Sequence, residues 1–126
     1  MGTWGPGNFE NDAALDFLNE QVDSYVGIIK EIFGDAARFR LDEDAEGMLM
    51  PSLEILLALN ERLHGKLPKG LDIAGWKSRY LSMYDEQIDG LEPDEGYKQL
   101  RRDTIATTFD KLLNLQAEQW PPHSMK

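Results

Sequence analysis

Residues 2–34 read GTWGPGNFENDAALDFLNEQVDSYVGIIKEIFG, a glycine-rich turn that leads into a long amphipathic helix. Asn11 or Asp12 provides the N-cap of this predicted helix, and Gly34 ends it. At 100° per residue, one apolar stripe covers an arc of roughly 120°, the pattern of a helix that packs against a core. The stripe consists of Ala14, Leu15, Leu18, Val22, Tyr25, Val26, Ile29, Ile32 and Phe33.

Phe17 and Ile28 fall outside this arc, on a thinner stripe that they share with Gln21 and Ser24. This second stripe either widens the buried face of the helix or forms a contact patch for another chain. The sequence leaves both interpretations open, and with them the oligomeric state.

The glycine-rich turn is expected to be ordered. Pro6 fixes one backbone dihedral between Gly5 and Gly7, which favours a specific turn over a loose tail. The rings of Trp4 and Phe9 are too apolar to remain in water without a cost in free energy. We therefore expect both rings to fold back onto the helices, so that the turn closes over the bundle as a lid.

Three further helices are predicted along the chain. Residues 48–63 are apolar on nearly every side, as in a central helix, and Pro51 lies in or kinks the first turn. The next helix is capped by Asp72 and extends to residue 88 or 89. The last helix begins near Pro93 and continues to Pro121. No segment is a clear strand, although residues 38–41 are a candidate for a short extended piece.

The length of 126 residues is that of one domain. We predict an all-α, single-domain bundle of about four helices over residues 1–120, with an ordered N-terminal loop, and a C-terminal tail at 121–126. Without cysteine the chain forms neither a disulfide nor a thiolate metal site. It also lacks an apolar run of the roughly 20 residues that span a membrane, and a secretion signal. These features predict a cytoplasmic protein.

The charge balance is strongly acidic, with 13 Lys and Arg against 23 Asp and Glu and a net charge of −10. Such a charge repels a nucleic-acid backbone and an anionic bilayer, so we predict neither nucleic acid nor membrane as a partner. Two interpretations of the acidity remain. It keeps the protein in solution, or it steers the encounter with a basic protein partner.

Several motifs approach known ligand sites but are incomplete. The glycine-rich turn before a helix resembles a phosphate cradle, yet it is flanked by carboxylates and no Lys or Arg precedes Lys30. The runs Asp42-x-Asp44-x-Glu46-Gly47 and Asp85-x-Gln87-x-Asp89-Gly90 reproduce the first half of a calcium loop. Their twelfth positions are Leu53 and Gly96 instead of Glu. We interpret both runs as solvated acidic turns, and we predict no cofactor and no metal.

Glu61 and His64 form one copy of the Glu-x-x-His unit that di-iron bundles use twice. Because Gly65 follows, we interpret His64 as a helix C-terminal residue that interacts with the last carbonyls. The alternative is a metal-binding or hydrolytic site built from Glu54, Glu61 and His64, which needs further carboxylates such as Asp16 or Asp85. No residue is assigned a catalytic role.

Lys98, Arg101 and Arg102 form the one basic cluster of the chain. These side chains either pair internally with the acidic turns at 42–46 or 85–95, or serve as docking residues for a partner.

The opening pattern Met-Gly-x-Trp-Gly-x-Gly-x-Phe, continued as Glu-Asn-Asp-x-Ala-x-Asp-Phe-Leu, resembles the bacterial domain-of-unknown-function 4259 family. The resemblance covers Gly2 to Glu20, and a looser echo is Glu54 in an apolar helix. It implies a compact bacterial protein without an assigned enzymatic role. The structural residues of this pattern are Trp4, Gly5, Gly7, Phe9, Asn11 and Asp12, with Glu54 added on the looser echo.

Two expectations follow for the structure and the function. Glu54 should accept hydrogen bonds from the N-terminal loop, from Trp4 or the amides near Gly5. The leading functional hypothesis is a cytoplasmic protein-binding module, such as an immunity or antidote-type inhibitor that masks a basic toxin or nuclease. Acidic runs with nearby aromatic residues would steer and hold the partner. These runs are Asp42, Glu43, Asp44 and Glu46, and Asp85, Glu86 and Asp89.

Overall fold

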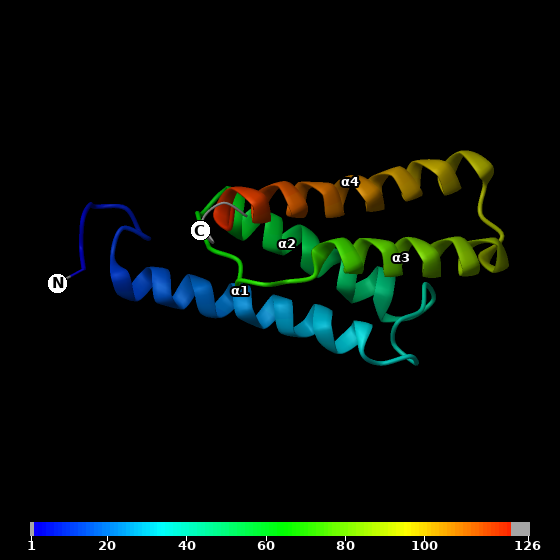
Figure 1. Ribbon diagram of the computed structural model, residues 1–126, viewed down its shortest axis with the longest axis horizontal. Helices are drawn as coiled ribbons and strands as arrows, with labels where there is room; N and C mark the ends of the chain where they lie inside the picture. Colours follow the sequence, from blue (N-terminus) through cyan, green and yellow to red (C-terminus); the bar gives the residue numbers. More distant parts are fainter. Residues whose placement is uncertain (1, 122–126) are drawn as a thin grey trace.

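A computed structural model of the chain describes residues 2–121, and it shows a bundle of four α-helices (Figure 1). The elements are α1 (Asp12–Phe33), η1 (Ala45–Leu49), α2 (Met50–Glu61), α3 (Ile73–Gln87), η2 (Ile88–Leu91) and α4 (Glu95–Gln119). Successive helices alternate in direction, so α2 and α4 run the same way. The described residues contain no strand, only an isolated bridge between Thr3 and Asn11. The predicted all-α bundle is confirmed.

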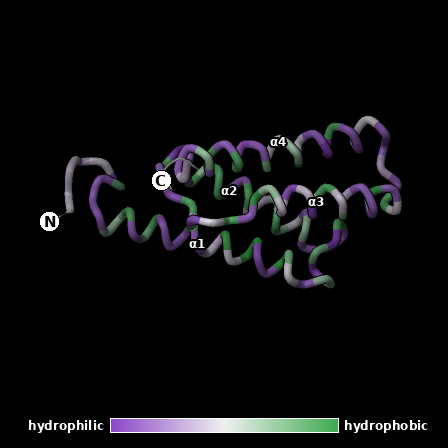
Figure 2. The backbone as a smooth tube through the Cα atoms, in the orientation of Figure 1, coloured by the Kyte–Doolittle hydropathy of each residue, from purple (hydrophilic) through white to green (hydrophobic). Residues whose placement is uncertain are grey.

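The core forms where α1 packs on α2, α2 on α4, and α3 on α4. Hydrophobic residues recur along these helices at helical spacing (Figure 2). The most enclosed large side chains include Tyr80, Tyr84 and Phe109. In α1 the predicted stripe is buried at Leu18, Val22, Val26, Ile29, Ile32 and Phe33. Of the second stripe, Ile28 packs against the core while Phe17 is 58% exposed.

The helix ends follow the predicted capping residues. The Asn11 side chain accepts a hydrogen bond from the Ala14 amide at 2.8 Å, and Gly34 follows the last residue of α1. The Asp72 side chain caps α3 by accepting from the Gly75 amide. Pro51 lies in the first turn of α2, where a missing N–H has no cost.

The structure differs from the predictions for one extended piece and for the starts of two helices. Residues 38–41 form turns instead of an extended piece, because the amides of residues 38–40 bond to carbonyls two to four residues earlier, as from Phe39 to Asp35. The helix expected from residue 48 begins earlier, with the π-helical turn η1. The last helix starts at Glu95, after the N-cap Asp94, and not at Pro93.

The N-terminal loop closes on itself at the start of α1. Its backbone and side-chain hydrogen bonds join Trp4 N–H to Glu10 O at 3.0 Å, Asp12 N–H to Gly2 O at 2.6 Å, and Gly7 N–H to Glu10 Oε1 at 2.9 Å. A Cβ added at Gly5 would collide with the Glu10 carboxylate. The loop therefore wraps around an acidic side chain of its own.

The expected lid is wrong for Trp4, whose side chain is 54% exposed, while Phe9 is half-buried. Because the loop is bonded within residues 2–12, it projects from the end of α1 and does not lie across the bundle (Figure 1). The predicted tail, 121–126, lies outside the described residues apart from Pro121. Within residues 2–121, no helix has both the length and the apolar character to cross a bilayer.

Candidate functional site

The two predicted acidic turns meet at one end of the bundle. The connection between α1 and η1 lies beside the connection between α3 and α4 (Figure 1). The Leu41 amide donates a 3.0 Å hydrogen bond to the Gln87 side chain, which ties the two segments together. We call this region the acidic end.

An apolar groove of about 510 Å³ opens at the acidic end. Leu91 and Tyr97 line it and are 51% and 54% exposed. A second hollow of about 350 Å³ shares Leu41 and Leu91 with the groove, so these side chains separate two neighbouring depressions. The apolar groove is lined by Leu41, Glu46, Ile88, Leu91, Pro93, Asp94 and Tyr97.

Five of the seven acidic residues predicted to bind a partner form ion pairs within the chain. The pairs are Asp42 with Arg40 (3.2 Å), Asp44 with Arg38 (2.6 Å), Glu46 with Arg101 (2.8 Å), Asp85 with Arg102 (2.8 Å) and Asp89 with Lys98 (2.7 Å). Internal pairing, the first of the two interpretations of the basic cluster, is thereby confirmed. The Arg102 guanidinium lowers the pKa of Asp85. Glu43 and Glu86 form no ion pair with any described residue.

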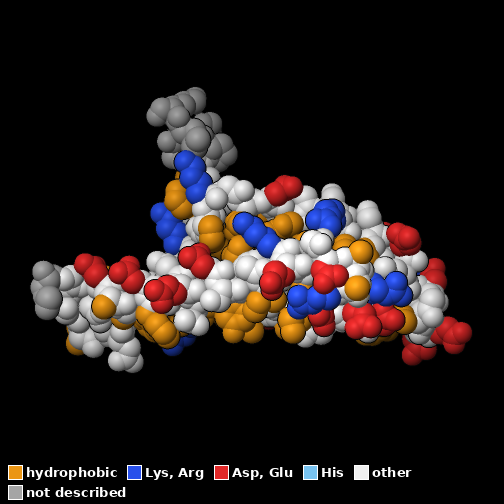
Figure 3. Space-filling view, turned by 90° about the horizontal axis from the view of Figure 1, so that it is seen from below, with side chains coloured by type: hydrophobic (Ala, Val, Ile, Leu, Met, Phe, Trp, Pro, Cys, Tyr) orange, Lys and Arg blue, Asp and Glu red, His pale blue; other side chains and the backbone are white. Residues whose placement is uncertain are grey.

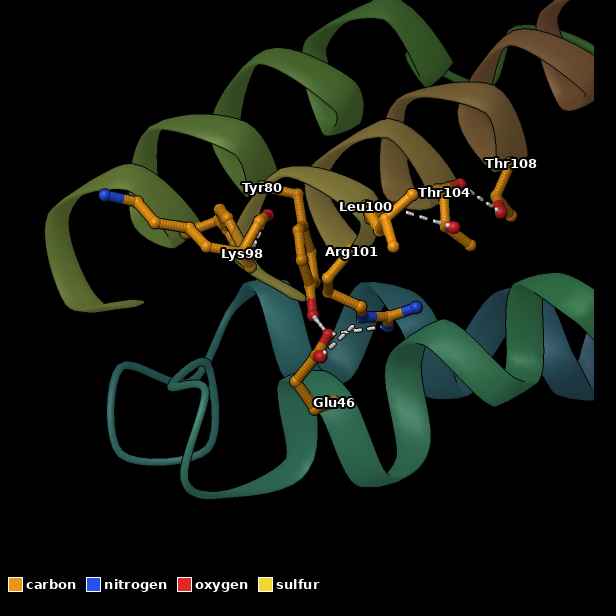
Figure 4. A network of polar contacts seen from close by, with 8 residues as sticks. Glu46, Tyr80, Lys98, Leu100, Arg101, Thr104 and Thr108 are labelled. Atoms are coloured by element: carbon orange, nitrogen blue, oxygen red, sulfur yellow. Dashed lines mark hydrogen bonds and ion pairs between the residues drawn. The ribbon is translucent and has the colours of Figure 1, made fainter. Parts of the chain in front are cut away.

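Glu46 links three elements through one carboxylate (Figure 4). Its Oε1 accepts from Arg101 Nε at 2.8 Å, while Oε2 accepts from Arg101 Nη2 at 2.9 Å and from the Tyr80 hydroxyl. Such two-pronged pairing is among the stronger side-chain interactions. Burial and the bond to Glu46 raise the pKa of Tyr80. The network fixes η1, and with it one wall of the apolar groove, against α3 and α4.

Carboxylates that form no ion pair with a described residue lie in the same segments of the chain that line the apolar groove. Residues 85–95 contain six Asp and Glu and no Lys or Arg. Four of these six, together with Glu43, form no ion pair within residues 2–121. Acidic side chains gather at this end of the face in Figure 3. We define the carboxylate rim as Glu43, Glu86, Glu92, Asp94 and Glu95.

The apolar lining of the groove was missed by the sequence analysis. The sequence pattern favours a helix start at Pro93 and an extended piece at Leu41. The available signal was Leu91, a large apolar residue in an acidic turn next to Gly90. A residue in such a turn does not lie on a helix face that packs against the core. A surface position for Leu91 could therefore be predicted.

The residues of the alternative metal site are not brought together. Glu54 is exposed near Arg101 and Thr104, whereas Glu61 and His64 line a separate cleft. Across residues 2–121 no group of three or more His, Asp and Glu side chains is placed to hold a metal ion. His64 takes the left-handed conformation (φ 63°) and its amide donates to the Asn60 carbonyl, so its predicted place at the helix end is confirmed.

The predicted bond between Glu54 and the N-terminal loop is wrong. Glu54 is in the first half of α2, near the acidic end, while the loop projects from the opposite end of the bundle (Figure 1). The loop satisfies its own amides with Glu10 instead.

Comparison with known proteins yields one match. Residues 2–49 match the family model described as Domain of unknown function (DUF4259). The matched segment contains the N-terminal loop, α1 and the turn that carries Glu46. No curated protein and no solved structure matches the chain.

Proposed function

We propose that this chain, whose residues 2–49 match the DUF4259 family model, is a cytoplasmic protein-binding module that receives a basic partner at its acidic end. The observation that supports this most is the apolar groove, where Leu91 and Tyr97 are more than half exposed beside the carboxylate rim. Aromatic and aliphatic groups in a concave site are the usual anchors of an interface.

The apolar groove and the carboxylates of the acidic end support a partner that combines an apolar side chain with Lys or Arg. An aliphatic or aromatic side chain of the partner fills the groove, and Lys or Arg side chains on either side of it face the carboxylate rim. Charge accelerates the encounter, and apolar burial slows dissociation. The rim keeps Glu43 and Glu86 from the seven acidic residues predicted from the sequence and leaves out the other five, because those five already have a cation within the chain.

The biological form that we propose is an immunity or antidote-type inhibitor that masks a basic toxin or nuclease. A nuclease holds the phosphate backbone with Lys and Arg side chains. An acidic surface with an apolar anchor is suited to cover such residues. If the gene next to this one encodes a basic toxic protein, co-expression of the wild-type chain should restore growth, and a variant with a reversed rim should not.

Selection of short random peptides on the purified protein tests the binding module directly. We expect enrichment of Lys and Arg around one apolar residue, and binding that weakens as salt is added. The triple variant Glu86→Lys, Glu92→Lys and Asp94→Lys should weaken the selected peptides at least about tenfold. The variant Leu91→Ser, which keeps the charge, should also weaken them.

A triple variant on the exposed face of α1, Glu20→Lys, Asp23→Lys and Glu31→Lys, is the matched control, because it changes the net charge by the same amount. It should retain most of the affinity. Peptides selected without basic residues, or an equal loss in both triple variants, would show that the acidic end is not the binding site.

A further inference from the structure

A larger cleft lies at the opposite end of the bundle from the acidic end. It has a volume of about 770 Å³ and opens between the C-terminal parts of α2 and α4. The volume is in the range of sites that hold small molecules. Because its lining includes Glu61, His64, Lys66, Lys111, Leu115 and Glu118, we call it the polar cleft.

The polar cleft has a firmly bonded floor. Asn60 is 3% exposed, and its amide donates to the Leu56 carbonyl at 2.8 Å while its Oδ1 accepts from Gln119 at 3.1 Å. The Gln119 side chain in turn accepts from the Leu67 amide at 2.7 Å. These polar groups are already hydrogen-bonded within the protein, so the floor has a fixed shape. A ligand would therefore be recognised by the side chains of the walls.

The walls carry charges of both signs that do not pair with each other. Among the described residues, Glu61, His64, Lys111 and Glu118 appear in none of the ion pairs. The Lys66 ammonium lies 4.3 Å from the centre of the Trp120 ring, at the side of the cleft. The carboxylates of Glu61 and Glu118 and the ammonium group of Lys111 are therefore available to a molecule that enters.

The order of side chains along α4 is a pattern of cation, apolar group and anion. Lys111, Leu115 and Glu118 are spaced by four and three residues, so they share one face of the helix. Seven residues of helix rise about 10 Å, which separates the Lys111 and Glu118 backbones by two turns. The anionic side chain is the one nearer the C-terminus of α4, where the helix dipole favours a bound cation.

We propose that the polar cleft binds a small zwitterion in which a short aliphatic chain separates a carboxylate from an ammonium group. Lys111 pairs with the carboxylate of the ligand. Leu115 contacts the aliphatic chain, and Glu118 accepts hydrogen bonds from the ammonium group. This site is separate from the acidic end and does not depend on the protein-binding function.

Titration with 6-aminohexanoate, followed by amide chemical shifts in NMR, tests the proposal. We expect saturable shifts at His64, Gly65 and Leu115. Hexanoate and hexylamine, which each keep one of the two charges, should bind at least about tenfold more weakly. The variants Lys111→Gln and Glu118→Gln should each reduce the affinity for 6-aminohexanoate by a similar factor.

The matched controls are Lys30→Gln and Glu31→Gln, which remove the same charges from the exposed face of α1. They should leave the titration unchanged. Because all four variants alter exposed residues, their amide spectra verify that each remains folded. Absence of saturable shifts, equal binding of hexanoate or hexylamine, or losses in the controls that match those at Lys111 and Glu118 would overturn the proposal.

Discussion

Among the charged side chains, Glu46 is the one whose loss, or whose loss of its cation, should lower the free energy of unfolding most. It shares two hydrogen bonds with Arg101, and both side chains are about a quarter exposed. Arg101→Ala leaves this carboxylate without its cation, so we expect a loss of about 2 to 3 kcal/mol in the free energy of unfolding. Urea denaturation measures it.

Arg102→Ala is the natural comparison, because Arg102 also makes a two-pronged pair, with Asp85, but in a more exposed position. Exposed pairs contribute about 1 kcal/mol or less. Equal losses of unfolding free energy in Arg101→Ala and Arg102→Ala would show that the pair with Glu46 stabilises the fold no more than an exposed pair does.

Tyr80 should make the protein sensitive to alkaline pH. Burial raises its folded-state pKa above the ordinary tyrosine value of about 10. The neutral hydroxyl is therefore favoured in the folded state, and the resulting stability is complete below about pH 10 and is lost as the pH rises further. Tyr80→Phe should reduce the slope of unfolding free energy against pH above 10. An unchanged slope would show that Tyr80 does not contribute.

At this scale the pairing of the basic cluster was predictable, whereas the role of Tyr80 was not. The basic side chains are long and flexible, and carboxylates outnumber them in this chain, so each can reach a carboxylate. A tyrosine on an apolar stripe indicates only burial, since the partner of its hydroxyl depends on the placement of a residue 34 positions away.

The caps determine where α1 and α3 begin, and they were predictable because a cap involves only neighbouring residues. The Asn11 side chain satisfies the Ala14 amide, so Asn11→Ala should lower the free energy of unfolding by about 1 kcal/mol. Asp94 is the N-cap of α4 but forms no side-chain cap hydrogen bond. Asp94→Ala should change thermal stability much less, and a larger effect there than at Asn11 would refute this account of the caps.

Local sequence patterns could not predict the π-helical turn η1 or the apolar groove. Ala45 and Leu49 are fully buried in η1, and Glu46 between them turns toward α3 and α4. That geometry depends on helices that follow much later in the chain. The groove likewise depends on the bond from Leu41 to Gln87, which joins segments 46 residues apart.

For the whole molecule, the N-terminal loop is an appendage of the bundle and not part of its core. Within the described residues, the hydrogen bonds of residues 2–10 do not extend beyond Asp12, and Trp4 is mostly exposed. Deletion of residues 2–9 keeps the Asn11 cap, so the free energy of unfolding should change by less than about 1 kcal/mol. A loss of several kcal/mol would instead indicate that the loop supports the core.

The position of that loop has a practical consequence for handling the protein. The N-terminal loop lies at one tip of the molecule, and the apolar groove, which the connection between α3 and α4 helps to line, lies at the other. A molecule attached to a sensor chip or a carrier through its first residues therefore points its groove outward into the medium. In this orientation the support does not obstruct the groove.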